Sequence, residues 1–200
     1  MERTLQLIEE FSNLGVKAIN IVGAGEPTID PAFPLIMDKI ASKGIIPIVF
    51  THGGNLTDEI MNILTRTRAS VIIKVNSFNP ATQDKLVNRP GYAKKRDAGL
   101  ARLIEKGFNA PGDGYQTRLG IDSVVCRENM GEIEEIFRYC RATNIMPLMK
   151  TFIPAGRTRF RTDMEISFAE FTQLSKKIRE IDAKEYGIVY TVGEMNNKRP

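Results

Sequence analysis

The sequence of 200 residues predicts a single α/β domain, residues 1–200, with a parallel sheet shaped as a partial (β/α) barrel or a doubly wound sheet. Short apolar runs rich in β-branched residues alternate with amphipathic helical segments, and glycine-rich or polar turns follow the runs. No linker, repeat or low-complexity stretch divides the chain. Since strands separated by helices pair in parallel through right-handed crossovers, one continuous sheet is expected.

Turn and capping residues separate the elements expected in the first half of the chain. Pro34 suits the first turn of a helix, where its missing N–H needs no partner. Thr57 is an N-cap candidate, and the two acidic residues after it favour a helix N-terminus. In chain order, the elements are helix Glu2–Ser12, strand Ala18–Val22, a helix from Pro34 to Gly44, strand Ile45–Phe50, a helix after Thr57 and strand Ser70–Val75.

In the second half, helical spacing over Asp84–Lys106 is interrupted by Pro90 and Gly91, which predicts two helical pieces. Ser167 or a neighbour caps a long helix that runs to about Ala183. The pattern begins with a helix that has no strand before it, which is unusual for such a fold. The other elements expected are turn Asn109–Gly114, strand Thr117–Val125, helix Met130–Thr143, strand Met146–Ile153 and strand Ile188–Val192.

The composition is that of an ordinary globular protein, with 42% hydrophobic and 26% charged residues and a net charge of +4. Positive charge is mostly scattered, so we expect no nucleic-acid partner. No apolar run approaches the ~20 residues of a membrane helix, and the N-terminus lacks a signal-peptide pattern, so a cytoplasmic location is expected. Cys126 and Cys140 are interpreted as buried thiols, and with His52 as the single histidine we expect no metal site built from these residues.

The segment Gly23–Thr28, with the sequence GAGEPT, directly follows the first apolar run. Its glycines permit a tight turn and a close approach of a ligand to the backbone. Glu26 stands where α/β folds place ligands, and its carboxylate suits an ammonium group. We expect Glu26 to face the mouth of the site, so that its replacement weakens binding and hardly affects folding. An ordinary turn with a solvated glutamate is the alternative.

Polar residues at the other strand ends extend the candidate site. His52 is interpreted as a helix cap or a loop hydrogen bonder rather than an acid–base catalyst. Asn76 and Ser77 either contact a ligand or cap the helix that follows. Lys74 and Lys150 lie inside strands, where an unpaired ammonium is costly, so each is expected to reach the mouth or pair with a carboxylate.

In their order and spacing, these segments resemble the radical S-adenosylmethionine (radical SAM) enzymes. GAGEPT is similar to the family's Gly-Gly-Glu-Pro segment, and Phe50–Thr57 resembles its Thr-Asn-Gly segment followed by Leu-Thr. Lys74–Ser77 matches the strand end that contacts ribose. Ile121–Asn129 and Phe152–Arg157 resemble the family's fifth and sixth strands, so the resemblance extends from Met1 to about Arg157.

The resemblance implies a partial, TIM-like (β/α) barrel of the radical SAM type that holds S-adenosylmethionine beside a 4Fe-4S cluster. Reductive cleavage would yield a 5′-deoxyadenosyl radical, which abstracts hydrogen from a small-molecule or peptide substrate. No catalytic residue is identified. The cofactor-binding residues implied are Gly23, Ala24, Gly25 and Glu26 at the methionyl ammonium, Asn76 and Ser77 at the ribose or carboxylate, Val124 at the adenine, and Thr51. Lys74, Lys150 and Arg157 are substrate-side candidates.

The sequence departs from the family in lacking its cluster ligands, Cys-x3-Cys-x2-Cys, which follow the family's first strand. Cys126 and Cys140 have neither that spacing nor that position. We therefore expect a domain with its first strand missing, truncated at the N-terminus and inactive alone, whose exposed sheet edge favours self-association. The alternatives are a non-catalytic binding or partner domain, or an ordinary (β/α)-barrel enzyme that binds an anionic metabolite through Lys74, Lys150 and Arg157.

Overall fold

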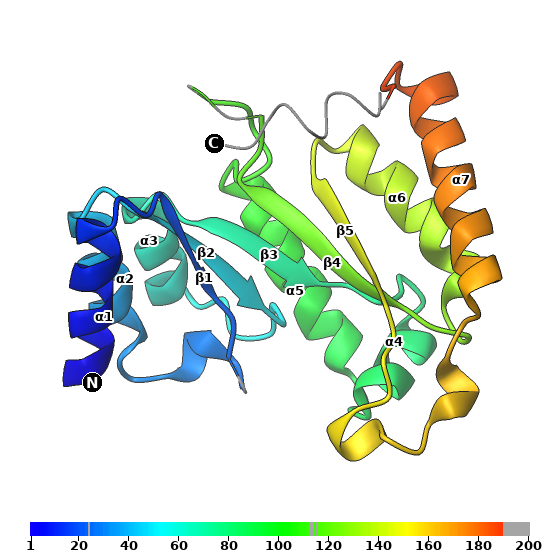
Figure 1. The fold of residues 1–200 in the computed structure, drawn as a ribbon, viewed down its shortest axis with the longest axis horizontal. Helices are drawn as coiled ribbons and strands as arrows, with labels where there is room; N and C mark the ends of the chain where they lie inside the picture. Colours follow the sequence, from blue (N-terminus) through cyan, green and yellow to red (C-terminus); the bar gives the residue numbers. More distant parts are fainter. Residues whose placement is uncertain (24, 113, 115, 190–200) are drawn as a thin grey trace.

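Five parallel strands form one curled sheet in a computed structural model, which describes residues 1–23, 25–112, 114 and 116–189 (Figure 1). The order across the sheet follows the chain, β1-β2-β3-β4-β5, so right-handed crossovers place the connecting helices on one face. The predicted α/β half-barrel is confirmed. The strands are β1 (Ala18–Ile21), β2 (Ile46–Thr51), β3 (Ser70–Lys74), β4 (Leu119–Val125) and β5 (Met146–Thr151).

Two of the helices begin at side-chain caps that the sequence predicts. Thr57 accepts a hydrogen bond from the N–H of Ile60 through its side chain, and Ser167 forms a capping box with Glu170. None of the helices in the described part of the chain has the length and apolarity needed to cross a membrane. The helices are α1 (Glu2–Asn13), α2 (Phe33–Ser42), α3 (Asp58–Arg66), α4 (Pro80–Val87), α5 (Tyr92–Glu105), α6 (Ile133–Ala142) and α7 (Phe168–Glu185).

Two elements differ from the sequence-based expectation. Helix α4 begins at Pro80, ahead of Asp84, because the side chain of Asn79 caps it by accepting the N–H groups of Ala81 and Thr82. In the strand expected at Ile188–Val192, the first two residues belong to no strand, and positions 190–192 lie outside the described residues.

The two faces of the sheet have different chemistry. Residues that face the helices are fully buried and apolar, among them Val49, Val71 and Ile121. On the concave face, the register places Lys74 beside Asp122 and Val124 beside Lys150. Since parallel strands carry their carboxyl ends at one edge, the predicted site residues gather at the mouth of the half-barrel.

Candidate functional site

The carboxylate of Glu26 fixes the turn after β1 to the end of β2. Its Oε1 accepts hydrogen bonds from the N–H and hydroxyl of Thr28, at 3.2 and 2.6 Å, and from the hydroxyl of Thr51 at 2.7 Å. Its Oε2 accepts the N–H of His52 at 2.8 Å. The side chain is only 6% exposed. The expectation that Glu26 packs against little is therefore wrong, because its donors include groups 25 and 26 residues away in sequence.

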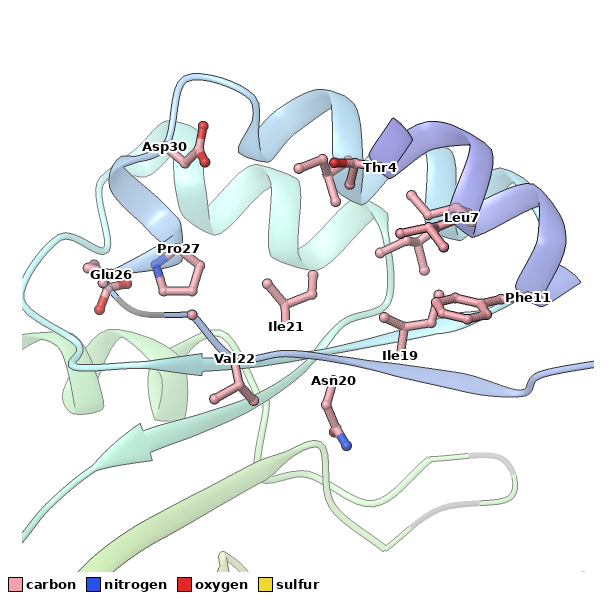
Figure 2. Close-up of a pocket in the computed structure, with 15 residues that line it drawn as sticks. Thr4, Leu7, Phe11, Ile19, Asn20, Ile21, Val22, Glu26, Pro27 and Asp30 are labelled. Atoms are coloured by element: carbon pink, nitrogen blue, oxygen red, sulfur yellow. The ribbon is translucent and has the colours of Figure 1, made fainter. Parts of the chain in front are cut away.

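The backbone of the same turn is open. Gly23 and Gly25 are exposed, and a Cβ added at Gly25 would meet no atom within 4 Å. Ala24 lies outside the described residues. The turn borders a groove of about 400 Å³ between α1, α2 and β1, and Figure 2 shows Glu26 and Pro27 at one end of it and Phe11 at the other. This turn thus combines accessible peptide groups with an internally held carboxylate.

His52 is a loop hydrogen bonder, as expected. Its Nδ1 accepts the N–H of Gly54 at 2.9 Å. The same Nδ1 lies 3.4 Å from Oε2 of Glu26. The hydroxyl of Tyr92 donates to the carbonyl of His52, and burial, with the charge of Glu26 second, raises the pKa of Tyr92 to about 12. Tyr92 therefore keeps its proton and holds this loop.

Asn76, predicted at the ribose or carboxylate of the cofactor, and Val124, predicted at the adenine, are in direct contact. The N–H of Val124 donates to Oδ1 of Asn76 at 3.0 Å. Asn129, fully buried, donates through Nδ2 to the carbonyls of Asn76 and Val124 at 2.7 and 2.9 Å and accepts the N–H of Cys126 at 2.8 Å. Sequence reasoning missed the role of Asn129, although an asparagine just after a strand is a signal for side-chain bonding to turn backbone.

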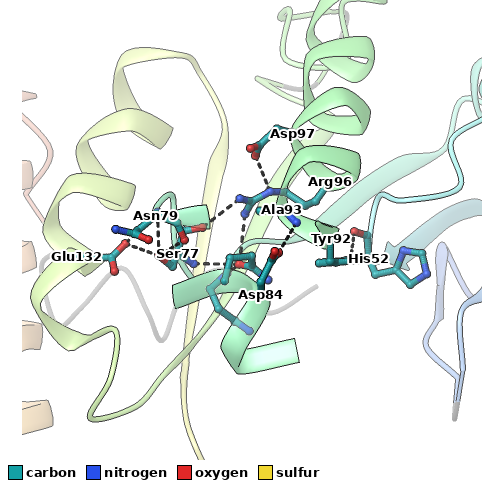
Figure 3. A network of polar contacts seen from close by, with 11 residues as sticks. His52, Ser77, Asn79, Asp84, Tyr92, Ala93, Arg96, Asp97 and Glu132 are labelled. Carbon is teal, nitrogen blue, oxygen red and sulfur yellow. Dashed lines mark hydrogen bonds and ion pairs between the residues drawn. The ribbon is translucent and has the colours of Figure 1, made fainter. Parts of the chain in front are cut away.

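Ser77 is fully buried and engaged within the protein. Its hydroxyl donates to Glu132, and its carbonyl accepts a 3.0 Å hydrogen bond from Arg96 (Figure 3). Arg96 is itself fully buried and lies 2.7 Å from Asp97, while burial lowers its pKa. The network of Ser77, Glu132, Arg96 and Asp97 ties α5 and the segment before α6 to the end of β3. The sequence had not indicated the last three of these residues.

Lys74 and Lys150 pair with one carboxylate on the concave face, as one of the two expected outcomes. Nζ of Lys74 lies 2.9 Å from Oδ2 of Asp122, and Nζ of Lys150 lies 3.2 Å from its Oδ1. Lys150 also lies 5.2 Å above the ring of Phe50. The side chain of Arg157 is outside what the structure describes, so its predicted place beside the lysines stays a prediction.

The cysteines do not fit an iron–sulfur cluster. Cys126 follows β4 and Cys140 lies in α6, and both are buried free thiols. Burial raises the pKa of Cys140 to about 12, which disfavours the thiolate that a cluster requires. Within the described ranges, no three His, Cys, Asp or Glu side chains are grouped to hold a metal ion.

Comparison with known sequences supports the family resemblance. A family model described as the radical SAM superfamily matches residues 1–140. The chain is 27% identical to an S-adenosylmethionine-dependent nucleotide dehydratase of Flammeovirga pacifica, covering 66% of this chain and 43% of that protein. It is 28% identical to a probable GTP 3',8-cyclase of Methanothermobacter marburgensis, covering 94% and 64%. The chain thus spans less than two thirds of the length of these relatives.

Solved structures share the fold. SuiB of Streptococcus suis bound to S-adenosylmethionine superposes with a TM-score of 0.74 at 13% identity, covering 91% of this chain and 40% of that one. SuiB bound to its precursor peptide SuiA superposes with a TM-score of 0.75 at 14% identity, covering 90% and 39%. At these identities, the likeness concerns the half-barrel itself.

Proposed function

Because this chain belongs to the radical SAM superfamily, we propose that its half-barrel binds S-adenosylmethionine at the mouth, within an enzyme that cleaves this cofactor reductively. When bound beside a 4Fe-4S cluster, S-adenosylmethionine supplies a 5′-deoxyadenosyl radical that abstracts a substrate hydrogen. Two buried cysteines cannot supply the thiolates of such a cluster, so the chain alone is expected to be inactive.

The turn after β1 is the proposed site of the methionyl ammonium. The observation that carries this assignment is the open backbone of Gly23 and Gly25 above a buried carboxylate. Peptide carbonyls there can accept an ammonium N–H, with Ala24 between them. Glu26 is proposed to act by holding the turn and by its negative charge, which favours a cation close by.

The far end of the cofactor is proposed to lie at β3 and β4. Val124 is half-buried on the concave face and presents an apolar surface for the adenine. Asn76 holds the backbone of Val124, and Ser77 and Thr51 fix the neighbouring strand ends from buried positions. In this proposal, side chains of the predicted site shape the mouth, and backbone and apolar surfaces touch the ligand.

Calorimetric titration of the full chain with S-adenosylmethionine tests the proposal. Gly25→Val places a side chain where a ligand would lie, and its added Cβ meets no protein atom within 4 Å. We expect about a tenfold or greater loss of affinity at an unchanged Tm. Gly131→Val, at another glycine with open space around it, is the matched control and should bind as the wild type does. If the two variants bind S-adenosylmethionine with equal affinity, the turn after β1 is not part of the binding site.

The substrate of the whole enzyme is proposed to be a small molecule or a peptide. The two curated relatives above are named for nucleotide substrates, and the SuiB structure holds a precursor peptide. The sequence identity to these two relatives, 27% and 28%, is higher than the 14% identity to SuiB, which favours a small-molecule substrate.

A further inference from the structure

We propose that Lys74, Asp122 and Lys150 form a recognition site for an anionic oxygen group of the substrate, a phosphate or a carboxylate. The inference rests on the proposed function, because it names the substrate class for the same half-barrel mouth. Its test, however, needs neither S-adenosylmethionine nor a cluster.

The three side chains come from neighbouring strands and meet on the concave face. Lys74 on β3 and Lys150 on β5 flank Asp122 on the central strand β4, each contacting a different carboxylate oxygen. Among the described residues, no other carboxylate forms an ion pair with either lysine. Two ammonium groups and one carboxylate leave the cluster with a net charge of about +1.

Folding accounts for only one of the two lysines. The side chain of Asp122 is 8% exposed, so an ion partner is needed to keep the charged carboxylate in place. Lys74 meets that need with a 2.9 Å hydrogen bond to Oδ2. The Lys150 contact with Oδ1 lacks hydrogen-bond alignment. The positive charge of Lys150 is therefore in excess of what Asp122 requires.

The ammonium groups are accessible to a ligand. The side chain of Lys74 is 32% exposed and that of Lys150 is 54% exposed. Phe50 lies beneath Lys150, and the half-buried Leu148 pairs in register with Asp122, so the site has apolar surroundings. Charge interactions are stronger beside apolar walls than in open water, and an ammonium with unused N–H donors suits anionic oxygens.

Calorimetric titration of the full chain at low ionic strength tests the site, with tripolyphosphate and acetate as probes. Lys74→Met and Lys150→Met keep the length of the side chain and remove its charge, and each should weaken binding about three- to tenfold. Asp122→Asn removes the competing negative charge and should tighten binding by about the same factor. Lys94→Met, on the exposed surface of α5, is the matched control and should change nothing.

Anion affinity should fall in the two lysine variants and rise in Asp122→Asn. This opposite response distinguishes anion recognition from a structural role, because a purely structural ion cluster would not bind anions more tightly when Asp122 is neutralised. Preference for tripolyphosphate assigns a phosphate-bearing substrate, and preference for acetate assigns a carboxylate. The proposal is overturned if neither probe binds, or if the lysine variants bind as Lys94→Met does. Anion binding without S-adenosylmethionine binding would contradict the proposed function and leave this site standing.

Discussion

The carboxylate of Glu26 and the hydroxyl of Thr51 are joined by a 2.7 Å hydrogen bond between residues 25 positions apart in the sequence. Glu26 lies in the turn that follows β1, and Thr51 is the last residue of β2. Both segments belong to the proposed site, so the bond fixes the relative position of two of its parts. Replacing Glu26, which positions both segments, is therefore expected to affect folding and binding together.

Glu26→Gln is therefore expected to destabilise the fold. The glutamine amide keeps one acceptor oxygen. Its NH2 group takes the place of the other carboxylate oxygen and faces hydrogen-bond donors that the wild-type carboxylate accepts. Charge-assisted bonds of this kind contribute about 1.5–3 kcal/mol, and we expect a loss of that order in the free energy of unfolding. Urea unfolding measures it. Glu105→Gln, an exposed carboxylate at the end of α5, is the control and should unfold as the wild type does. If Glu26→Gln is as stable as the wild type but binds S-adenosylmethionine weakly, Glu26 contacts the ligand directly instead of supporting the turn.

Asn129 is expected to tolerate neither alanine nor aspartate. Alanine removes the side-chain partner of two partly buried carbonyls and of one buried N–H. Aspartate keeps the shape but directs a negative charge at the same carbonyls. Each substitution should cost about 2–3 kcal/mol in the free energy of unfolding. If Asn129→Asp proves as stable as the wild type, the assigned amide orientation is incorrect.

Gly99→Ala is expected to destabilise the protein although alanine favours helices. A Cβ at position 99 in α5 would lie 2.1 Å from the carbonyl oxygen of Gly53. Overpacking of this kind costs about 1–3 kcal/mol, which exceeds the helix gain of about 1 kcal/mol. Thermal unfolding measures the balance, with Gly131→Ala as a control at an open position. A raised Tm for Gly99→Ala would show that α5 can move away from Gly53, in the loop after β2, without a loss of stability.

Glu170 makes the start of α7 sensitive to acid. Its hydrogen bond from the N–H of Ser167, followed by those from Arg127 and the Ser167 hydroxyl, lowers its pKa from 4.5 to about 2. Since the folded-state pKa is depressed, the stabilisation is complete above pH 4.5 and is lost as the pH falls toward 2. The stability difference between the wild type and Glu170→Gln, measured by urea unfolding across this range, should shrink on acidification. A difference independent of pH would refute the assignment.

The free edge of β1 is expected to support self-association. Among the described strands, β1 pairs with β2 alone, and an unpaired edge can receive another strand. Asn20→Lys puts a charge on this exposed edge strand and should lower the sedimentation coefficient of concentrated samples toward that of a monomer. Asn13→Lys, at the end of α1, should leave it unchanged. Monomeric wild type at high concentration would contradict the expectation.

Local signals in the sequence were sufficient for the order of β1 to β5 and of the helices between them, but not for the start of α4 or for the strand expected at Ile188–Val192. Thr57 and Ser167 cap the helices as predicted, because an N-cap depends only on residues two or three positions ahead. The break at Pro90 and Gly91 likewise separates α4 from α5. Alternating strands and helices predicted a parallel sheet, either a partial barrel or doubly wound, and the family resemblance was needed to favour the half-barrel.

Long-range partners could not be read from the sequence. Lys74 and Asp122 are 48 residues apart, and Ser77 and Glu132 are 55 apart. Predicting which carboxylate meets which donor requires the register of neighbouring strands, which one sequence does not specify. For the same reason, the internal hydrogen bonds of Glu26 and Ser77 were not predicted, and the contact of these residues with a cofactor stays a prediction.

The sheet order, identical to the chain order, has a consequence for synthesis on the ribosome. Each strand pairs with the one translated just before it, so every βαβ unit can form as soon as its second strand has left the exit tunnel. Among the five described strands, each strand after β1 therefore emerges when its first partner has already been made. Throughout translation, the newest strand is the growing edge, and the next strand to emerge covers it.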